Sequence, residues 1–210
     1  VPAENYPFCT IDPSVGVVAV PDERLHKLAE FSKTQKTIPA AVEFVDIAGL
    51  VKGASEGEGL GNQFLSHIRE TDAIAEVVRI FEDSNIIHVD GKIDPVSDIE
   101  TINLELILAD MQTVTKRLAN IEKDVKRGDK ESLKEKDTLL RVQEALEAEK
   151  LAQEVTLNDE ERIVLRAMHL LTMKPILYVL NKKAGGKNLD EMNDPRYTAL
   201  LSYIKARNSH

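Results

Sequence analysis

Short apolar runs alternate with amphipathic stretches over the first part of the chain. The β-branched run at 15–20, the apolar run at 42–45 and the mostly apolar stretch at 73–81 predict strands. Helices are expected after Asp22, a candidate N-cap, and over about 60–70. The near-continuous apolarity of the third run is typical of a strand in a sheet covered on both faces. This alternation predicts an α/β layered sheet.

A different pattern begins near Asp98. Apolar residues recur there at alternating spacings of four and three, at Ile107, Met111, Val114, Leu118, Ile121 and Val125. A turn is expected at 127–129, and Leu139, Val142 and Leu146 continue the spacing on a second helix. This is the heptad pattern of a coiled coil. It predicts an antiparallel helical hairpin inserted into the α/β domain.

The α/β pattern returns after the predicted hairpin. Asn158 is expected to cap a helix over 159–171, and the apolar run at 175–180 predicts another buried strand. A final helix is predicted around Leu200.

Composition narrows the possible partners and compartment. The chain carries 30% charged and 4% aromatic residues, which favours long solvated helices, and its net charge is −9. Such a negative charge does not indicate extensive electrostatic binding to nucleic acid, so sequence-specific DNA binding is not expected. The lone Cys9 excludes an intramolecular disulfide and suits a reducing compartment. No apolar run approaches ~18 residues, so no membrane span is expected, and we expect a cytoplasmic protein.

The strand at 42–45 runs into the first candidate site. Asp46 ends it and Gly49 follows, an arrangement with which P-loop nucleotidases sense a metal-bound γ-phosphate. Leu50 then stands where many GTPases keep a water-orienting glutamine. The alternative is a strand-end aspartate that caps the next turn. Upstream, Thr10 could supply a hydroxyl to Mg²⁺, although an isolated loop threonine is more often a turn former.

A second candidate site follows the strand at 175–180. Asn181 can tie a base-binding loop to a phosphate loop, and the stem of Lys182 can stack on a purine. A guanine-reading site places a carboxylate two residues after that lysine, where this chain has Ala184. Guanine selectivity should therefore be weaker by roughly 1–3 kcal/mol. The phosphate-binding motif G-x-x-x-x-G-K-[ST] does not occur in these 210 residues.

The histidines and the cysteine are weaker candidates for functional residues than the two sites above. His88 lies among apolar neighbours, and its residue pattern favours a packed or capping role. His67 and Glu70 share a helix face, but without a third ligand in register they indicate a solvated surface. We interpret Cys9 as structural.

Three segments carry a family resemblance: NYPFCTIDP, FVDIAGLVKGASEGEGLGNQFLSHIRETDAI and NIIHVDGKIDPVSDIE. Together they resemble the YchF/Obg-like ATPase family, P-loop NTPases of the Obg group, and the likeness runs across essentially the whole chain. It implies a P-loop NTPase-type (Ras-like) layered sheet that a coiled-coil hairpin interrupts. It also implies hydrolysis of ATP, often in preference to GTP, with Mg²⁺, and association with ribosomes.

The resemblance assigns roles to individual residues. Thr10 matches the switch threonine that ligands Mg²⁺, while Asp46 and Gly49 match the phosphate-sensing turn. Leu50 matches the hydrophobic replacement of glutamine, and His88 matches the histidine proposed to assist hydrolysis in its place. At the base loop, the matching residues are Asn181 and Lys182, whose main chain would meet the adenine.

The chain also departs from the family pattern. The base loop usually reads N-x-x-E, whereas Ala184 takes the place of the acid here. The P-loop strand and the C-terminal TGS domain are absent from these residues. We therefore expect a piece of a longer protein, with an incomplete sheet, that folds poorly and is inactive alone.

The expected division is 1–98 and 158–210 for the two parts of the nucleotide-binding domain and 99–157 for the helical insertion. The rival hypothesis is a non-catalytic interaction module that works through the hairpin.

Overall fold

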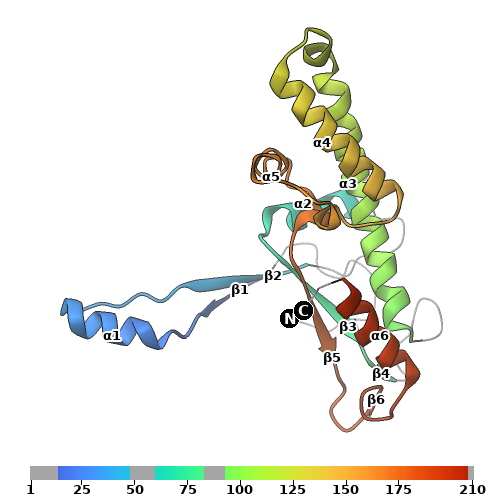
Figure 1. The fold of residues 1–210 in the computed structure, drawn as a ribbon. Coiled ribbons are helices and arrows are strands. Elements are labelled where there is room, and N and C mark those ends of the chain that lie inside the picture. The colour runs from blue at the N-terminus through green and yellow to red at the C-terminus, as the bar shows by residue number, and fades with distance from the viewer. Residues whose placement is uncertain (1–13, 48–59, 83–92, 208–210) are drawn as a thin grey trace.

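The computed structural model describes residues 14–47, 60–82 and 93–207, and Figure 1 labels its elements. In chain order the strands and helices are β1 (Ser14–Ala19), α1 (Glu23–Ser32), β2 (Ala41–Asp46), α2 (Leu60–Glu70), β3 (Ile74–Arg79), β4 (Phe81–Glu82), α3 (Pro95–Lys126), α4 (Lys130–Glu147), η1 (Ala152–Glu154), α5 (Asp159–Arg166), η2 (Leu171–Met173), β5 (Ile176–Asn181), β6 (Lys187–Asn188) and α6 (Pro195–Ala206), where η marks a 3₁₀ helix.

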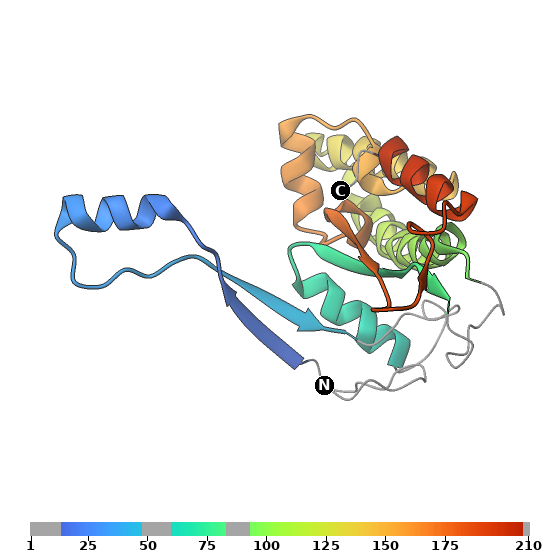
Figure 2. The ribbon, with the colours of Figure 1, turned by 90° about the horizontal axis from the view of Figure 1, so that it is seen from below.

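Strands β1 and β2 form an antiparallel ribbon with α1 in its connection, and we call β1, α1 and β2 the arm. The arm projects away from the rest of the chain (Figures 1 and 2). Its ladder runs from Ser14 opposite Asp46 to Ala19 opposite Ala41. Asp22 caps α1 as predicted, because its Oδ1 accepts from the Arg24 N–H at 3.0 Å. Nearly every strand residue of the arm is exposed.

The second sheet is a parallel pair, β3 with β5, in which Ile74 lies opposite Ile176 and Arg79 opposite Asn181. Its side chains alternate between buried and exposed. Val78 and Tyr178 are buried in the main core, whereas Val77 and Leu177 are 64% and 51% exposed. The expectation that both faces would be covered is therefore wrong for the described residues. The described helices cover only one face of the β3–β5 sheet. The exposed face could not be predicted, because the mostly apolar run at 73–81 shows no alternation of apolar and polar residues.

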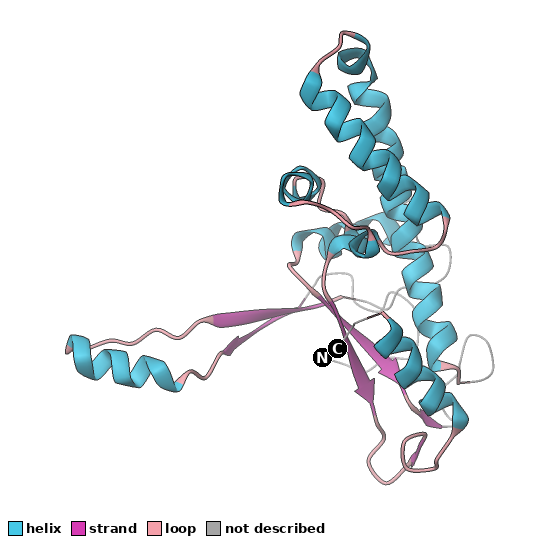
Figure 3. Cartoon of the chain, in the orientation of Figure 1, coloured by secondary structure: helices cyan, strands magenta, loops and turns pink. Residues whose placement is uncertain are grey.

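A third, two-residue ladder pairs β4 with β6, Phe81 opposite Asn188 and Glu82 opposite Lys187. It draws the loop after β5 back against the chain that follows β3. The described part of the chain thus holds three separate two-stranded sheets beside several helices (Figure 3). This confirms a mixed α/β fold whose sheets are small and incomplete.

The predicted helical hairpin is confirmed as α3 and α4. Asp129 caps α4 by accepting from the Ser132 N–H at 2.8 Å, and Gly128 in the turn has φ +82°. The buried seam consists of Val114 and Ile121 from α3 and Leu139, Val142 and Leu146 from α4. It continues into the main core, which also holds Val78, Ile176, Tyr178 and Leu200. The hairpin is therefore rooted in the same core as the β3–β5 sheet.

A smaller core forms around α2. Its buried members are Phe64, Leu65, Ile68, Leu106, Ala109 and Leu171, and we call them the α2 cluster. Ile47, which follows Asp46 directly, packs against this cluster. The end of β2 therefore contacts the core shared by α2 and the lower part of α3.

The helix that follows the hairpin, α5, is shorter than predicted. Asn158 and Glu161 form a reciprocal capping box at the start of α5, with N–H to oxygen distances of 2.9 and 2.8 Å. The helix ends at Arg166, and His169 takes a left-handed φ of +49° before η2. None of the described helices is long and apolar enough to span a membrane.

Candidate functional site

The structure describes only part of the predicted nucleotide site. Thr10, Gly49, Leu50 and His88 lie outside the described residues. Asp46, Asn181 and Lys182 lie within them. Asp46 ends β2 of the arm, whereas Asn181 ends β5 of the parallel pair, so the two belong to different sheets.

Asp46 presents an available carboxylate. Asp46 is exposed at the end of β2, and its side chain makes no hydrogen bond or ion pair with another described residue. Carboxylate oxygens are ligands that Mg²⁺ prefers, so the side chain fits a magnesium site. Within ranges 14–47, 60–82 and 93–207, no group of three or more His, Cys, Asp or Glu side chains could hold a metal ion.

Asn181 stands at the carboxyl end of a parallel pair, the edge at which open α/β sheets bind ligands. Its carbonyl accepts from the Ile80 N–H at 3.0 Å, which fixes the backbone as it leaves the strand. Its side chain is exposed and makes no hydrogen bond with another described residue. The amide is therefore available to a ligand or to a neighbouring loop.

Lys182 is held by two carboxylates. Its Nζ lies 2.7 Å from Asp190 Oδ2 and 2.8 Å from Glu191 Oε1. Hydrogen bonds to Asp190 and then Glu191 raise the pKa of Lys182, and the same pairing lowers the pKa of Glu191. This clamp directs the lysine head toward the following segment, so only its stem and main chain remain for a base.

Asn188 closes the loop between Lys182 and the clamp. It is 3% exposed, its Oδ1 accepts from the Lys183 N–H at 2.9 Å, and its Nδ2 donates to the Lys183 carbonyl at 3.1 Å. Nδ2 also donates to Glu191 Oε2 at 3.2 Å. Asn188, Asp190 and Glu191 were not predicted from the sequence. Their only signal was a polar cluster a few residues after the candidate base loop.

Comparison with known proteins identifies the family. The family model described as "50S ribosome-binding GTPase" matches residues 1–108, from the first segment to the lower part of α3. The chain belongs to the 50S ribosome-binding GTPase family. The expected P-loop GTPase-like fold is confirmed with it.

Within this GTPase family, the chain is similar to proteins named ribosome-binding ATPase YchF. It is 58% identical to the one from Bacillus subtilis (strain 168) over 91% of this chain and 51% of that protein. It is 51% identical to the one from Escherichia coli O157:H7 over 88% of this chain and 51% of that protein. The resemblance to the YchF family is thereby confirmed. The chain spans about half the length of the curated relatives it matches.

A solved GTPase of the same kind matches the fold. The YchF GTPase of Schizosaccharomyces pombe has a TM-score of 0.71 and 37% identity, covering 96% of this chain and 55% of that one.

A buried polar group joins the hairpin to this GTPase fold. Asp110 of α3 is fully buried, and its carboxylate accepts from the Leu171 N–H at 2.9 Å and the Thr172 N–H at 2.7 Å. The Thr172 hydroxyl donates a third bond at 2.7 Å. Burial raises the pKa of Asp110, and these hydrogen bonds act in the opposite direction. Asp110 thus caps η2, which leads directly into β5 and the candidate base loop.

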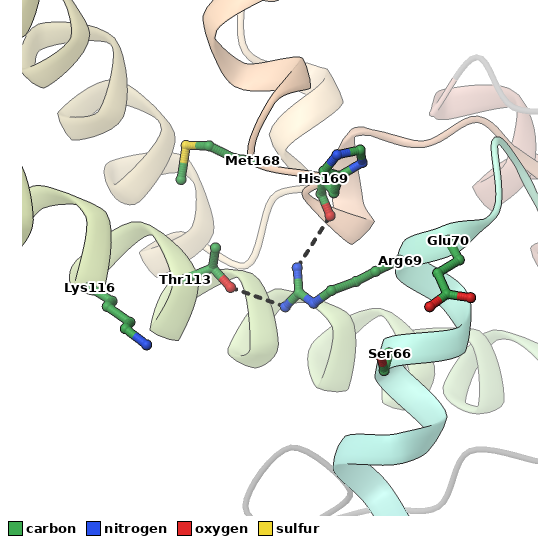
Figure 4. A pocket seen from close by; sticks show the side chains of 7 residues that line it. All are labelled: Ser66, Arg69, Glu70, Thr113, Lys116, Met168 and His169. Carbon is green, nitrogen blue, oxygen red and sulfur yellow. Dashed lines mark hydrogen bonds between the residues drawn. The ribbon is translucent and has the colours of Figure 1, made fainter.

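An open pocket of about 490 Å³ lies beside this joint, between α2, α3 and the chain before η2 (Figure 4). Its lining residues are Ser66, Arg69, Glu70, Thr113, Lys116, Met168 and His169. Arg69 reaches from α2 toward α3, with hydrogen bonds to Thr113 and to the His169 carbonyl (Figure 4). The pocket therefore marks the contact between α2 and the base of the helical hairpin.

Proposed function

We propose that the full-length protein is a Mg²⁺-dependent switch that binds and hydrolyses ATP or GTP and associates with the ribosome in the cytoplasm. The observation that carries this proposal is the 58% identity, over 91% of this chain, to a protein named a ribosome-binding ATPase. The available carboxylate of Asp46 and the closed base loop after Asn181 are consistent with it. The chain's own residues would bind, orient and sense the nucleotide.

The phosphate end of the proposed site is assigned to four residues. Thr10 and Asp46 would hold Mg²⁺, which when bound neutralises charge that develops on the phosphates. The main-chain N–H of Gly49 would sense the γ-phosphate. Leu50 cannot orient a water molecule, so hydrolysis would be slow unless His88 contributes that function.

The base end is assigned to Asn181 and the main chain at Lys182. The clamp by Asp190 and Glu191 supports this assignment, because a fixed loop gives the base a preorganised main-chain edge. Ala184 offers no carboxylate to the guanine N1 and N2 groups. We therefore propose that ATP and GTP bind with similar affinity, or that ATP is preferred.

We also propose that 1–98 and 158–210 build the nucleotide-binding domain and that 99–157 is the helical insertion. A second candidate function is a non-catalytic interaction module in which the hairpin binds a protein or ribosomal partner. One feature favours this alternative: Ala184 stands where the family's base loop usually has an acid.

Nucleotide binding to the full-length protein separates the two candidates. A fluorescent ATP analogue is displaced by unlabelled ATP and GTP in the presence of Mg²⁺. We expect both to compete, because Ala184 lacks the carboxylate whose bidentate contact would favour GTP by roughly 1–3 kcal/mol. Absence of any nucleotide binding would leave the interaction module as the better account. The 210-residue chain alone is expected to show no measurable ATP turnover.

The catalytic role of His88 has a test in the same protein. We expect His88→Ala to lower turnover by roughly 10²-fold or more while leaving nucleotide affinity unchanged. His26→Ala, at an exposed position on α1, is the matched control and should turn over like the wild type. Unchanged turnover in His88→Ala would refute the role of His88.

A further inference from the structure

The candidate base loop, which runs from Lys182 to the start of β6, turns back on itself as soon as it leaves β5 (Figure 1). Two main-chain hydrogen bonds close the turn. The Gly186 N–H donates to the Lys183 carbonyl at 3.0 Å, and beyond β6 the Leu189 N–H donates to the Ile80 carbonyl at 2.8 Å. Leu189 is completely buried in the main core, so the returning chain is held firmly.

One buried side chain fixes the inside of this loop. Asn188 Oδ1 accepts from the Lys183 N–H at 2.9 Å, and Nδ2 donates to the Lys183 carbonyl at 3.1 Å and to Glu191 Oε2 at 3.2 Å. Both N–H groups and the oxygen of the amide are therefore used within the protein. The Lys183 carbonyl, which also accepts from Gly186, has both of its lone pairs occupied.

This arrangement decides which main-chain groups a base can reach. The N–H and carbonyl of Lys183 are taken by Asn188, whereas those of Lys182 make no hydrogen bond with another described residue. Lys182 follows Asn181 directly, at the carboxyl end of β5. It thus presents one donor and one acceptor at the edge where open α/β sheets bind ligands. A purine edge offers the complementary acceptor and donor.

Gly186 allows the close return that brings Asn188 to Lys183. A Cβ atom at position 186 would lie 2.8 Å from Lys183 Cβ, which is closer than two side chains approach each other. A larger residue there would force the turn open and move Asn188 away from the Lys183 main chain. Ala184, between them, has no polar side-chain group with which to hold the loop. The loop therefore depends on Asn188 for its internal anchor.

We propose that Asn188 is a positioning residue for the nucleotide base. It holds the candidate base loop so that the main chain at Lys182 is presented to an adenine or guanine base, while the main chain at Lys183 is withheld. Because the loop is ordered before the nucleotide arrives, binding does not cost the entropy of ordering it. This inference rests on the proposed nucleotide binding and identifies the residue that shapes the base end of that site.

The test separates base binding from phosphate binding in the full-length protein. A fluorescent ATP analogue is displaced by ATP and by ribose 5′-triphosphate, which carries no base. We expect Asn188→Ala to weaken ATP roughly tenfold, because three hydrogen bonds of the loop are lost, and to leave ribose 5′-triphosphate unchanged. In steady-state hydrolysis, KM for ATP should rise by a similar factor while kcat stays at the wild-type value, since the phosphates are held elsewhere.

Three further variants test the anchor itself. Gly186→Ala should weaken ATP in the same selective way, although it leaves Asn188 in place. Asn188→Asp removes the donor to Glu191 and sets two carboxylates side by side, so it should also weaken ATP. Adding Glu191→Gln to Asn188→Asp places the amide donor on the opposite partner and should recover part of the affinity. Asn120→Ala, at an exposed position on α3, is the matched control and should bind ATP like the wild type.

Three results would overturn the proposal for Asn188. One is unchanged ATP affinity in Asn188→Ala. Another is an equal loss of affinity for ATP and ribose 5′-triphosphate, or a fall in kcat at unchanged KM, because a general loss of structure would act on the whole site. The third is a wild type that binds ATP no more tightly than ribose 5′-triphosphate. A wild type that binds neither compound would instead refute the proposed function.

Discussion

Glu76 places a carboxyl group inside the interface between the β3–β5 sheet and its covering helices. Its side chain is 6% exposed, and its Oε2 has no hydrogen-bond partner. Tyr178 lies directly opposite on β5 and is also buried. Burial, followed by the negative charge of Asp98, raises the pKa of Glu76 to about 8. The folded protein therefore holds this side chain protonated at neutral pH, whereas the unfolded chain ionises it.

This pKa shift predicts that Glu76 destabilises the fold as pH rises. The stability that the fold retains by keeping Glu76 protonated is fully present below the unfolded pKa of 4.5. It declines as pH rises toward about 8 and is lost above that pH. Glu76→Gln should raise the free energy of unfolding at pH 8.5 by an amount on the order of 3 kcal/mol, with little effect at pH 4.5. Urea unfolding of the full-length protein at the two pH values checks this. Glu43→Gln, exposed on β2, should behave like the wild type at both. An equal effect of Glu76→Gln at the two pH values would contradict the protonated state.

At the scale of elements, the hairpin derives its stability from a continuous seam. Leu139 and Val142 of α4 are completely buried, and they lie in the same core as Val114 and Ile121 of α3. The ion pair of Arg117 with Glu135 crosses the two helices at their surface. Exposed pairs of this kind contribute at most about 1 kcal/mol, so the apolar seam holds the helices together.

Two adjacent leucines provide a matched test of the seam. Leu139→Ala removes a fully buried side chain and should cost roughly 2–5 kcal/mol of hairpin stability. Leu140→Ala, at a position that is 47% exposed, should cost less than about 1 kcal/mol. Amide hydrogen exchange in α3 and α4 of the full-length protein measures both effects. Similar exchange rates in the two variants would contradict the assigned seam.

At the scale of the molecule, much apolar surface is left open. One face of the arm carries Val18, Val42 and Phe44, which are 54%, 45% and 56% exposed. The open face of the β3–β5 sheet adds Val77 and Leu177. An isolated two-stranded ribbon is at best marginally stable in water. Contiguous exposed apolar patches also promote association.

The 210-residue chain alone should therefore bind a hydrophobic dye and self-associate. We expect its apparent mass in sedimentation to rise with concentration, together with strong fluorescence of anilinonaphthalene sulfonate. Val42→Thr with Phe44→Thr should lower both signals, because the two substitutions make one arm face more polar. Met192→Thr, at a position that is 42% exposed outside the arm, is the control and should change them little. A monomeric chain that binds no dye would contradict this reading of the arm.

Local patterns predicted more of the fold than of the site. The heptad spacing between Ile107 and Leu146 predicted both helices and their turn. A helical period can be recognised from residues that are close together in the sequence. The caps at Asp22 and Asn158 are local in the same way. Asp110 could not be assigned, since its partners lie 61 and 62 residues away at Leu171 and Thr172.

The candidate base loop shows the same limit. Asn181 was found because it ends an apolar strand, which is a feature of the sequence itself. The stem of its neighbour Lys182 was expected to stack on a purine, and that remains a prediction. What the sequence did not predict is that the ammonium group of Lys182 is bound by Asp190 and Glu191. Those two acids could not be assigned because nothing in a single sequence shows which way a surface loop folds back. The β4–β6 ladder escaped prediction for the same reason, since strands of two residues carry no periodicity.

Helix α3 extends far beyond Asp110, the residue at which it is hydrogen-bonded to η2. About 16 residues separate Asp110 from the end of the helix at Lys126, a span of roughly 24 Å at ~1.5 Å per residue. A tilt of about 10° around that fulcrum would carry the far end through roughly 4 Å, close to the length of a side chain. The hairpin can therefore act as a lever arm that magnifies a displacement too small to alter its own packing.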